Sequence, residues 1–317
     1  MSHYDDVISA INQGEVVPFL GAGVNLFGRE EQEEYAPGQY LPSGRELATY
    51  LAGTYRYPLQ DKKDLLRVSQ YASVMRGMGS LYNRLGEVFD ANYPTTELHR
   101  FFARLPRLLR EKNFPQPYQL LVTTNYDDVL ERAFQEEKEP YDLVTYVAKN
   151  PNRGKFRHVP HGAPARSSII IPDPNVYKDL PFMGVNLQRT VILKIHGAVD
   201  RVADRPNSRP DEIEDSFVIT EDDYINYLAQ TDISKLLPVQ LSSKLMYSGF
   251  LFLGYGLRDW NLRVIMNRIW GERQLSFSSW AIQLTAEEID QKFWASRGVT
   301  LIEEHLETYI TELEHRL

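Results

Sequence analysis

The sequence predicts an α/β protein with a mostly parallel sheet, helices on both faces of the sheet and a helical inserted subdomain. Three observations carry this prediction. Short, almost uninterrupted apolar strands recur along the chain, amphipathic helices separate them, and a block of helical periodicity follows the first strand. Strands that form continuous apolar runs are typical of a parallel sheet covered on both faces.

The first elements are a helix, a strand and a long helical block. Apolar residues on one face predict a helix over residues 4–13, and strand 16–20 follows. Residues 28–44 are polar, acidic and contain Pro and Gly, so they are predicted as a loop that enters an insertion, with Ser43 as a helix cap. Helical spacing then places the insertion at about residues 28–112, too long for a simple connection between strands.

Strands and helices alternate after the insertion. Strands are predicted at 119–123, 143–147, 191–195, 249–253 and 280–284, and helices at 127–135, 259–270 and 305–317. Residues 151–184 are rich in Pro, Gly and Asn and are predicted as a loop or partly β excursion. We interpret residues 1–317 as one domain that carries the insertion and this excursion.

Composition excludes several classes of protein. A net charge of -8 at pH 7 argues against broad binding to a phosphate backbone, which needs clustered Lys and Arg, so there is no strong direct nucleic-acid signal. The absence of cysteine excludes disulfides and cysteine-ligated zinc. The N-terminus has no signal-peptide pattern, and no apolar run approaches the roughly 18 residues of a membrane span. We expect a cytoplasmic protein with no membrane partner.

Four predicted strands end in glycine or polar clusters. The clusters are Gly21-Ala22-Gly23, Thr124-Asn125-Tyr126-Asp127, His196-Gly197 and Gly254-Tyr255-Gly256, with Asp259 just beyond the last. In an open parallel sheet, ligands bind beyond the carboxyl ends of the strands. We therefore expect these clusters to converge on one site.

The glycine turns predict a site for a phosphate or pyrophosphate, because such turns expose backbone N–H groups to an anion. Leu26 stands where the fingerprint of hydride-transfer enzymes needs a third glycine, and no P-loop motif is present. The alternative is that Gly21 and Gly23 only form a tight turn. The repetition at Gly254 and Gly256 favours the phosphate site.

Asn125 and Asp127 have two interpretations. Asn125 can cap the helix that follows it, with the acids favouring the helix dipole. Alternatively, Asn125 presents its amide to the crevice and Asp127 supplies a carboxylate there. The position at a strand end favours the second interpretation.

His196 closes an apolar strand, so we expect it at the strand tip and partly exposed, where a neutral imidazole can accept a proton. His158 and His161 form an H-x-x-H pair, but Pro160 and Gly162 break the helix that would aim both at one metal ion. No metal site is predicted.

Five ordered segments resemble the prokaryotic Sir2-like domain of NAD-consuming antiviral defence proteins. They are FLGAGVN, TTNYDDVLE, KIHGAVD, VITEDDYINYL and FLGYGLRDWNLRVIM. The resemblance spans about residues 5–317. It implies a Rossmann-like NAD-binding domain and an NAD+ hydrolase that releases nicotinamide and ADP-ribose, with NAD as substrate and no metal.

The resemblance also implies site residues. By motif match, Asn125 and His196 take the positions of the catalytic pair, and the turn from Gly21 to Gly23 corresponds to the pyrophosphate loop. The expected NAD contacts are Gly21, Ala22, Gly23, Asn25, Thr124, Asp127, Gly254, Gly256 and Asp259. In this scheme Asn125 positions the ribose or a water molecule, His196 is the base, and Asp127 contacts nicotinamide or supports the ribosyl cation.

Two alternatives remain beside the hydrolase. The chain is interpreted either as an enzyme or as a sensor or assembly subunit that binds NAD or ADP-ribose and is active only with a partner, such as a HerA-type ATPase. A homo-oligomer is expected in either case. The second alternative, an NAD-dependent deacylase, is disfavoured because the four-cysteine zinc module of protein deacetylases is missing.

Overall fold

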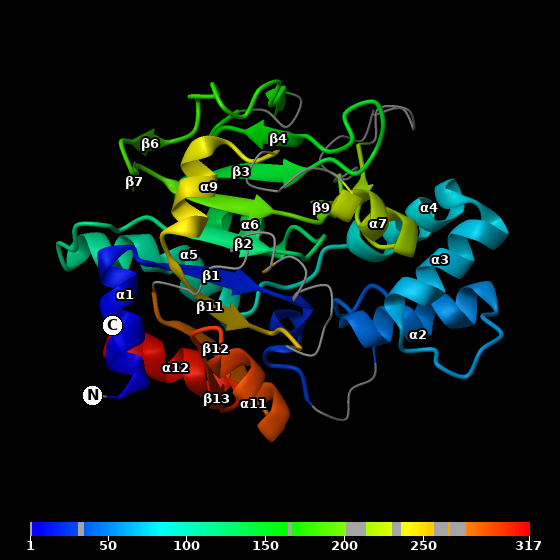
Figure 1. Cartoon of the computed structure of the whole chain (residues 1–317), viewed down its shortest axis with the longest axis horizontal. Coiled ribbons are helices and arrows are strands. Elements are labelled where there is room, and N and C mark those ends of the chain that lie inside the picture. Colours follow the sequence, from blue (N-terminus) through cyan, green and yellow to red (C-terminus); the bar gives the residue numbers. More distant parts are fainter. Residues whose placement is uncertain are drawn as a thin grey trace.

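A mostly parallel sheet forms the centre of the molecule (Figure 1). The computed structural model describes residues 2–30, 35–163, 167–200, 214–229, 236–256, 266 and 277–317. Within these residues the sheet has nine strands in the order β13-β12-β11-β1-β2-β8-β3-β4-β5. Neighbours from β13 to β3 pair in parallel, and the edge strands β4 and β5 are antiparallel. The predicted α/β fold is confirmed.

The strand bounds agree closely with the apolar runs of the sequence. The strands of the main sheet are β1 Val16–Leu20, β2 Leu120–Thr123, β3 Tyr141–Tyr146, β4 Phe156–Val159, β5 Ile169–Ile170, β8 Thr190–Lys194, β11 Gly249–Leu253, β12 Ser279–Gln283 and β13 Val299–Glu303. Two short antiparallel pairs lie outside it: β6 Phe182–Met183 with β7 Asn186–Leu187, and β9 Gly197–Ala198 with β10 Ser216–Phe217. Every residue of β1, β8 and β11 is buried, as expected for central strands of a covered parallel sheet.

Helices cover both faces of the sheet. One face packs against α7 Glu221–Ala229, α9 Val239–Met246 and α11 Glu288–Ala295. The other face packs against α1 His3–Gln13, α5 Glu97–Glu111, α6 Val129–Glu136 and α12 Leu306–Arg316. Alternate strand residues divide between the two cores: Val17 and Phe19 of β1 belong to the first, and Val16 and Leu20 to the second.

Three helices form a separate group beyond the tips of the parallel strands. They are α2 Gly44–Tyr55, α3 Leu65–Arg76 and α4 Met78–Phe89, and Figure 1 shows them past the ends toward which the central strands point. Their apolar cluster includes Tyr126 and Val129, which follow β2, and Phe217 of β10. The helical group therefore packs directly on the segments that follow the strands.

Local signals account for several element boundaries. Ser43 caps α2 as predicted: its hydroxyl accepts from the backbone N–H of Glu46, and its own N–H donates to Glu46 Oε2 at 2.8 Å. The sequence did not predict α7, α9, α11 or β13. The helix predicted at residues 259–270 lies, except for Met266, outside the described residues. No helix in the described part of the chain is both long and apolar enough to cross a membrane.

Candidate functional site

The four clusters found in the sequence follow four neighbouring strands. Strands β11, β1, β2 and β8 are consecutive in the sheet and parallel, so their carboxyl ends share one edge. The last residues of the four strands are also in register. Leu20 pairs with both Leu253 and Thr123, and Thr123 pairs with Lys194. The register thus places the starts of the four clusters side by side.

The two glycine turns pack against each other. Gly21 N donates to Leu253 O at 2.9 Å, and Gly23 N donates to Gly254 O at 2.8 Å. A Cβ on Gly21 or Gly23 would lie 2.7 Å from Gly254 O, and a Cβ on Gly254 would lie 2.3 Å from Val24 N. The close approach inferred from the sequence is present, but the group that approaches is protein backbone. No described atom lies within 4 Å of a Cβ placed on Gly256.

The first turn leads into a short 3-10 helix, η1 Ala22–Leu26, which carries Asn25. Asn25 Nδ2 donates to Asp127 Oδ2 at 3.2 Å, and Asn25 Oδ1 is buried with no hydrogen-bond partner in the part of the chain that the structure describes. Thr124, at the start of the turn after β2, places its hydroxyl in hydrogen-bond contact with the hydroxyl of Tyr255. The cluster after β2 is thereby connected to η1, which follows the first glycine turn, and to the cluster after β11.

Asn125 does not cap α6, so that interpretation is wrong. The cap position is Asp128. The N–H of Val129, the first residue of α6, donates to Asp127 Oδ1 at 3.1 Å. Asn125 instead donates from Nδ2 to Gly21 O at 3.3 Å, and its backbone N–H donates to Thr123 Oγ1 at 3.0 Å. Its carboxamide is therefore held against the first glycine turn.

His196 is more deeply buried than the sequence indicates. Its exposed fraction is 4%, so the expectation of a partly exposed ring is wrong. The ring lies edge-on to Tyr224 and Tyr227 of α7, and Nδ1 is 3.3 Å from the Tyr224 hydroxyl. Burial lowers the pKa of the imidazole to about 3, and Nε2 is buried without a hydrogen-bond partner among the described residues. The ring is thus neutral near pH 7, with one nitrogen uncommitted.

Asn125 and His196 occupy equivalent positions on adjacent strands. Each lies two residues beyond the paired residues Thr123 and Lys194. Their side chains do not hydrogen-bond to each other in the described structure: Asn125 contacts the turn after β1, and His196 contacts α7. Asp259, the last expected NAD contact, lies outside the described residues.

Sequence reasoning missed a buried cation next to these residues. Lys194, the last residue of β8, has an exposed fraction of 1%. Its ammonium donates to the carbonyl of Asp127 and, at 2.6 Å, to Glu131 Oε1 of α6. The only signal for it in the sequence is a lysine within the apolar run VILKI.

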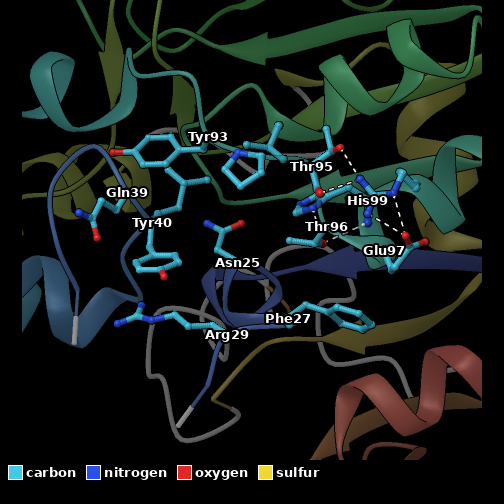
Figure 2. Close-up of a pocket in the computed structure, with 15 residues that line it drawn as sticks. Asn25, Phe27, Arg29, Gln39, Tyr40, Tyr93, Thr95, Thr96, Glu97 and His99 are labelled. Carbon is cyan, nitrogen blue, oxygen red and sulfur yellow. Dashed lines mark hydrogen bonds and ion pairs between the residues drawn. The ribbon is translucent and has the colours of Figure 1, made fainter. Parts of the chain in front are cut away.

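A pocket of about 280 Å³ borders Asn25. It lies between the segment after η1 and the start of α5, and Figure 2 shows Asn25 between Tyr40 on one side and His99 on the other. The lining residues are Asn25, Phe27, Gly28, Arg29, Gln39, Tyr40, Leu41, Tyr93, Pro94, Thr95, Thr96, Glu97, His99, Arg100 and Val129. The wall therefore combines aromatic rings with amide, hydroxyl and charged groups.

The surroundings of two polar groups in this wall, His99 and Arg29, determine the charge that each presents to the pocket. Burial, with the positive charges of Arg132, Arg100 and Lys194, lowers the pKa of His99 to about 3. Arg29 is paired with Glu46 at 2.7 Å and lies over the ring of Tyr40. The pocket thus presents a neutral imidazole and an arginine whose charge is balanced.

In the described structure, the two histidines of the H-x-x-H pair take part in hydrogen bonds around Asp142. His158 is fully buried between Asp142 Oδ2 at 3.1 Å and the Tyr177 hydroxyl at 2.7 Å. His161 contributes only its backbone N–H, which donates to Asp142 Oδ1 at 2.9 Å. Among the residues that the structure describes, no group of three or more His, Cys, Asp or Glu side chains is placed to hold a metal ion.

Comparisons with known proteins place this arrangement in a family. An NAD(+) hydrolase ThsA of Enterococcus faecium is 26% identical over 262 residues, which is 82% of this chain and 41% of that protein. Proteins of the same name from Acinetobacter baumannii (strain 532279) and Cytobacillus dafuensis are 26% and 22% identical, over 84% and 83% of this chain. The chain spans about two fifths of the length of these curated relatives.

The family model named SIR2-like domain matches residues 119–302. This segment includes β2, β8 and β11, and with them the clusters that contain Asn125, His196 and Gly254. Because the match covers more than half of the sequence, the chain belongs to the SIR2-like family.

Proposed function

We propose that the chain hydrolyses NAD+ at the bond between nicotinamide and ribose, giving nicotinamide and ADP-ribose, and that it depletes NAD+ in defence against phage. The observation that carries the proposal is the matched placement of Asn125 and His196 beyond two paired neighbouring strands, with Asn125 bonded to the Gly21 carbonyl. The names of the similar ThsA proteins support the reaction.

The reaction breaks one bond and forms another. The bond between N1 of nicotinamide and C1′ of ribose breaks, and its electron pair stays on N1, so the positively charged pyridinium leaves as a neutral molecule. The oxygen of a water molecule bonds to C1′, and one proton of that water is released. The protein accelerates the reaction by holding both halves of NAD+ and by orienting dipoles toward the cationic ribose.

His196 takes the role of base in this scheme. Its neutral imidazole accepts a hydrogen bond from the attacking water or from a ribose hydroxyl through the uncommitted Nε2. A pKa of about 3 makes the ring a weak base while it is buried, and polar groups of a bound substrate strengthen it by replacing part of the lost solvation. Asn125 orients the ribose or the water with its carboxamide.

The polar pair Asn25 and Asp127 faces the nicotinamide end of the substrate in this proposal. Asn25 borders the 280 Å³ pocket, and its Oδ1 lacks a donor that the carboxamide of nicotinamide can supply. The two glycine turns, with Ala22 and Thr124, contact the pyrophosphate and adenosine halves through atoms other than the N–H groups of Gly21 and Gly23, which already donate to Leu253 O and Gly254 O. Gly254, Gly256 and Asp259 belong to that second group of contacts.

Release of nicotinamide from NAD+ by the purified chain tests the proposal. The variants His196→Ala and Asn125→Ala are expected to reduce kcat by about 10²- to 10⁴-fold, with circular dichroism and the unfolding temperature showing that the fold is kept. His161→Ala, whose side chain makes no hydrogen bond in the described structure, is the matched control and is expected to retain turnover. Full turnover by both site variants would contradict the assigned roles.

A second candidate function is favoured by the burial of His196. With 4% of the residue exposed, substrate reaches the ring only after neighbouring residues move. The chain is then a subunit whose hydrolase activity depends on assembly, either as a homo-oligomer or with a partner such as a HerA-type ATPase. Turnover per subunit across a concentration series, with and without that partner, separates the two: constant turnover of the chain alone supports the autonomous enzyme.

A further inference from the structure

We infer that Lys194 is a positioning residue of the site: it holds the turn that carries Asn125 in place against the strand that carries His196. The inference rests on the proposed function. It concerns a residue that touches neither the substrate nor the reacting atoms in that scheme.

Lys194 and the carbonyl to which it donates are each two residues away from one of the two proposed catalytic residues. Lys194 lies two residues before His196, and the carbonyl to which it donates, that of Asp127, lies two residues after Asn125. One side chain therefore links the two segments at a fixed spacing. Because Lys194 is 1% exposed, solvent does not compete for its ammonium group.

A second contact from the same strand segment acts in parallel. Val199 N, three residues after His196, donates to Tyr126 O at 2.9 Å. Two successive carbonyls of the turn, those of Tyr126 and Asp127, thus accept from donors on either side of His196. The turn after β2 depends on the His196 segment for its backbone hydrogen bonds, in addition to its own contacts with β1.

Glu131 forms the ion pair that compensates for burial of the Lys194 ammonium group. It is 6% exposed, and its Oε1 accepts from Lys194 Nζ. Burial raises the pKa of the Glu131 carboxyl, and the neighbouring ammonium opposes that rise. An isolated buried ammonium at the start of α6 would face both desolvation and the positive end of the helix dipole. The carboxylate offsets both, so the two residues act as one unit.

A purely structural ion pair and a positioning residue make different predictions. Replacing a buried ion pair with apolar side chains of similar volume is often neutral for stability. Here the replacement also removes the donor to Asp127 O, so part of the stability is lost with that hydrogen bond even though the ion pair itself is dispensable. The turn then loses its defined position while the fold is retained, and misplacement of reacting groups by about 1 Å can cost about 100-fold in rate.

The test compares the double variant Lys194→Met/Glu131→Met with Glu131→Gln, which keeps the donor to Asp127, and with Arg110→Met. Arg110 of α5 forms an ion pair at 2.6 Å with Glu139, which follows α6; the Arg110 side chain is 37% exposed and the Glu139 side chain 5%. Arg110→Met is therefore the control for loss of an ion pair that does not touch the turn after β2. Four quantities are measured: kcat for NAD+, KM for NAD+, the unfolding temperature, and hydrogen exchange of the backbone amides of residues 124–129.

The double variant is expected to lose about 10- to 100-fold in kcat and to lose exchange protection in residues 124–129, with a smaller change in KM. Glu131→Gln is expected to lose less, and Arg110→Met is expected to stay within about two-fold of the original kcat at unchanged exchange. Original kcat and exchange in the double variant would overturn the inference. Equal losses in Arg110→Met, or loss of the fold only in the double variant, would overturn it too, since Lys194 would then act through stability.

The two proposals can fail separately. If the original chain does not hydrolyse NAD+ alone or with a partner, the proposed function fails, and hydrogen exchange at residues 124–129 still decides whether Lys194 holds the turn. If the original chain hydrolyses NAD+ and the double variant does so equally well, only the role of Lys194 fails.

Discussion

Asn25 Nδ2 and Asp127 Oδ2 lie 3.2 Å apart, although the two residues are 102 positions apart in the sequence. The hydrogen bond joins the turn after β1 to the turn after β2. Asp127 uses its other carboxylate oxygen to accept from the backbone N–H of Val129, at the start of α6. The buried Asp127 carboxylate therefore accepts hydrogen bonds both from the first turn of α6 and from the short helix after the first glycine turn.

Asn25→Asp is expected to destabilise the protein by about 1 to 3 kcal/mol at pH 8, because it removes a donor from a buried acceptor and places two carboxylates at hydrogen-bond distance. Asn25→Ser, which retains a hydroxyl donor and adds no charge, is expected to cost less. Urea unfolding at pH 8 and pH 5.5 measures the difference. The cost of the aspartate should shrink at the lower pH as the pair takes up a proton; equal unfolding free energies for the two variants at pH 8 would contradict this account.

Gly254→Ala is expected to lower the free energy of unfolding by about 2 to 4 kcal/mol. The residue has φ +68°, and its Cβ would lie 2.3 Å from Val24 N, a backbone atom that cannot move aside cheaply. Gly256→Ala is the control, because its Cβ would have no described atom within 4 Å and its φ lies outside the left-handed region. Thermal unfolding of both variants measures the contrast, and similar losses in the two would rule out the steric explanation.

His158→Ala is expected to cost about 2 to 4 kcal/mol, because it removes the imidazole from between buried Asp142 Oδ2, which keeps only the longer contact with Arg189 at 3.3 Å among the described residues, and the Tyr177 hydroxyl. His161→Ala is expected to change stability by less than about 0.5 kcal/mol, since only its backbone makes a hydrogen bond. Chemical denaturation of both variants tests the pair. A large cost for His161→Ala would show that its side chain has a function that these contacts do not include.

Acidification is expected to destabilise the protein from about pH 6.5 downward. His99 and His196 have pKa values of about 3 in the folded protein, whereas an unfolded histidine titrates near 6.5. The unfolded state therefore binds more protons between these values, and each histidine contributes a loss of about 2 kcal/mol at pH 5 relative to its contribution near neutral pH. The raised carboxyl pKa of Glu131 acts in the opposite direction.

A variant isolates one histidine from the other titrating groups. His99→Asn keeps an acceptor near the Thr96 hydroxyl, which lies 2.7 Å from His99 Nδ1 in the original chain. The free energy of unfolding of this variant is expected to fall less steeply between pH 7 and pH 5 than that of the original chain. Parallel curves would show that His99 does not take up a proton on unfolding.

The sequence was sufficient to predict the sheet and the meeting of its strand ends. Apolar runs such as 16–20 and 249–253 are local signals, and the rule that ligands bind beyond parallel strands does not require the strand order to be known. The order β11-β1-β2-β8 then placed the four clusters on one edge. The edge strand β13 and the helices α7, α9 and α11 were not predicted.

The features that the sequence did not predict depend on contacts between distant residues. The burial of His196 comes from Tyr224, 28 positions away on a helix that was not predicted. The partner of Lys194 is 63 positions away in the sequence. The group that approaches Gly23 is Gly254. No local pattern encodes such pairs, so a glycine turn or a strand-end histidine indicates that something is close without indicating what.

The contact between Gly23 and Gly254 bears on which residues of a related sequence indicate an enzyme. These glycines allow the turn after β1 to pack against the turn after β11. Selection for a stable fold alone would therefore preserve them, even in a related protein that no longer binds a nucleotide. The side chains of Asn125 and His196 do not hydrogen-bond to each other in the described part of the chain. Under the proposed function, their joint loss would therefore be the earlier sign that a related protein no longer carries out the reaction.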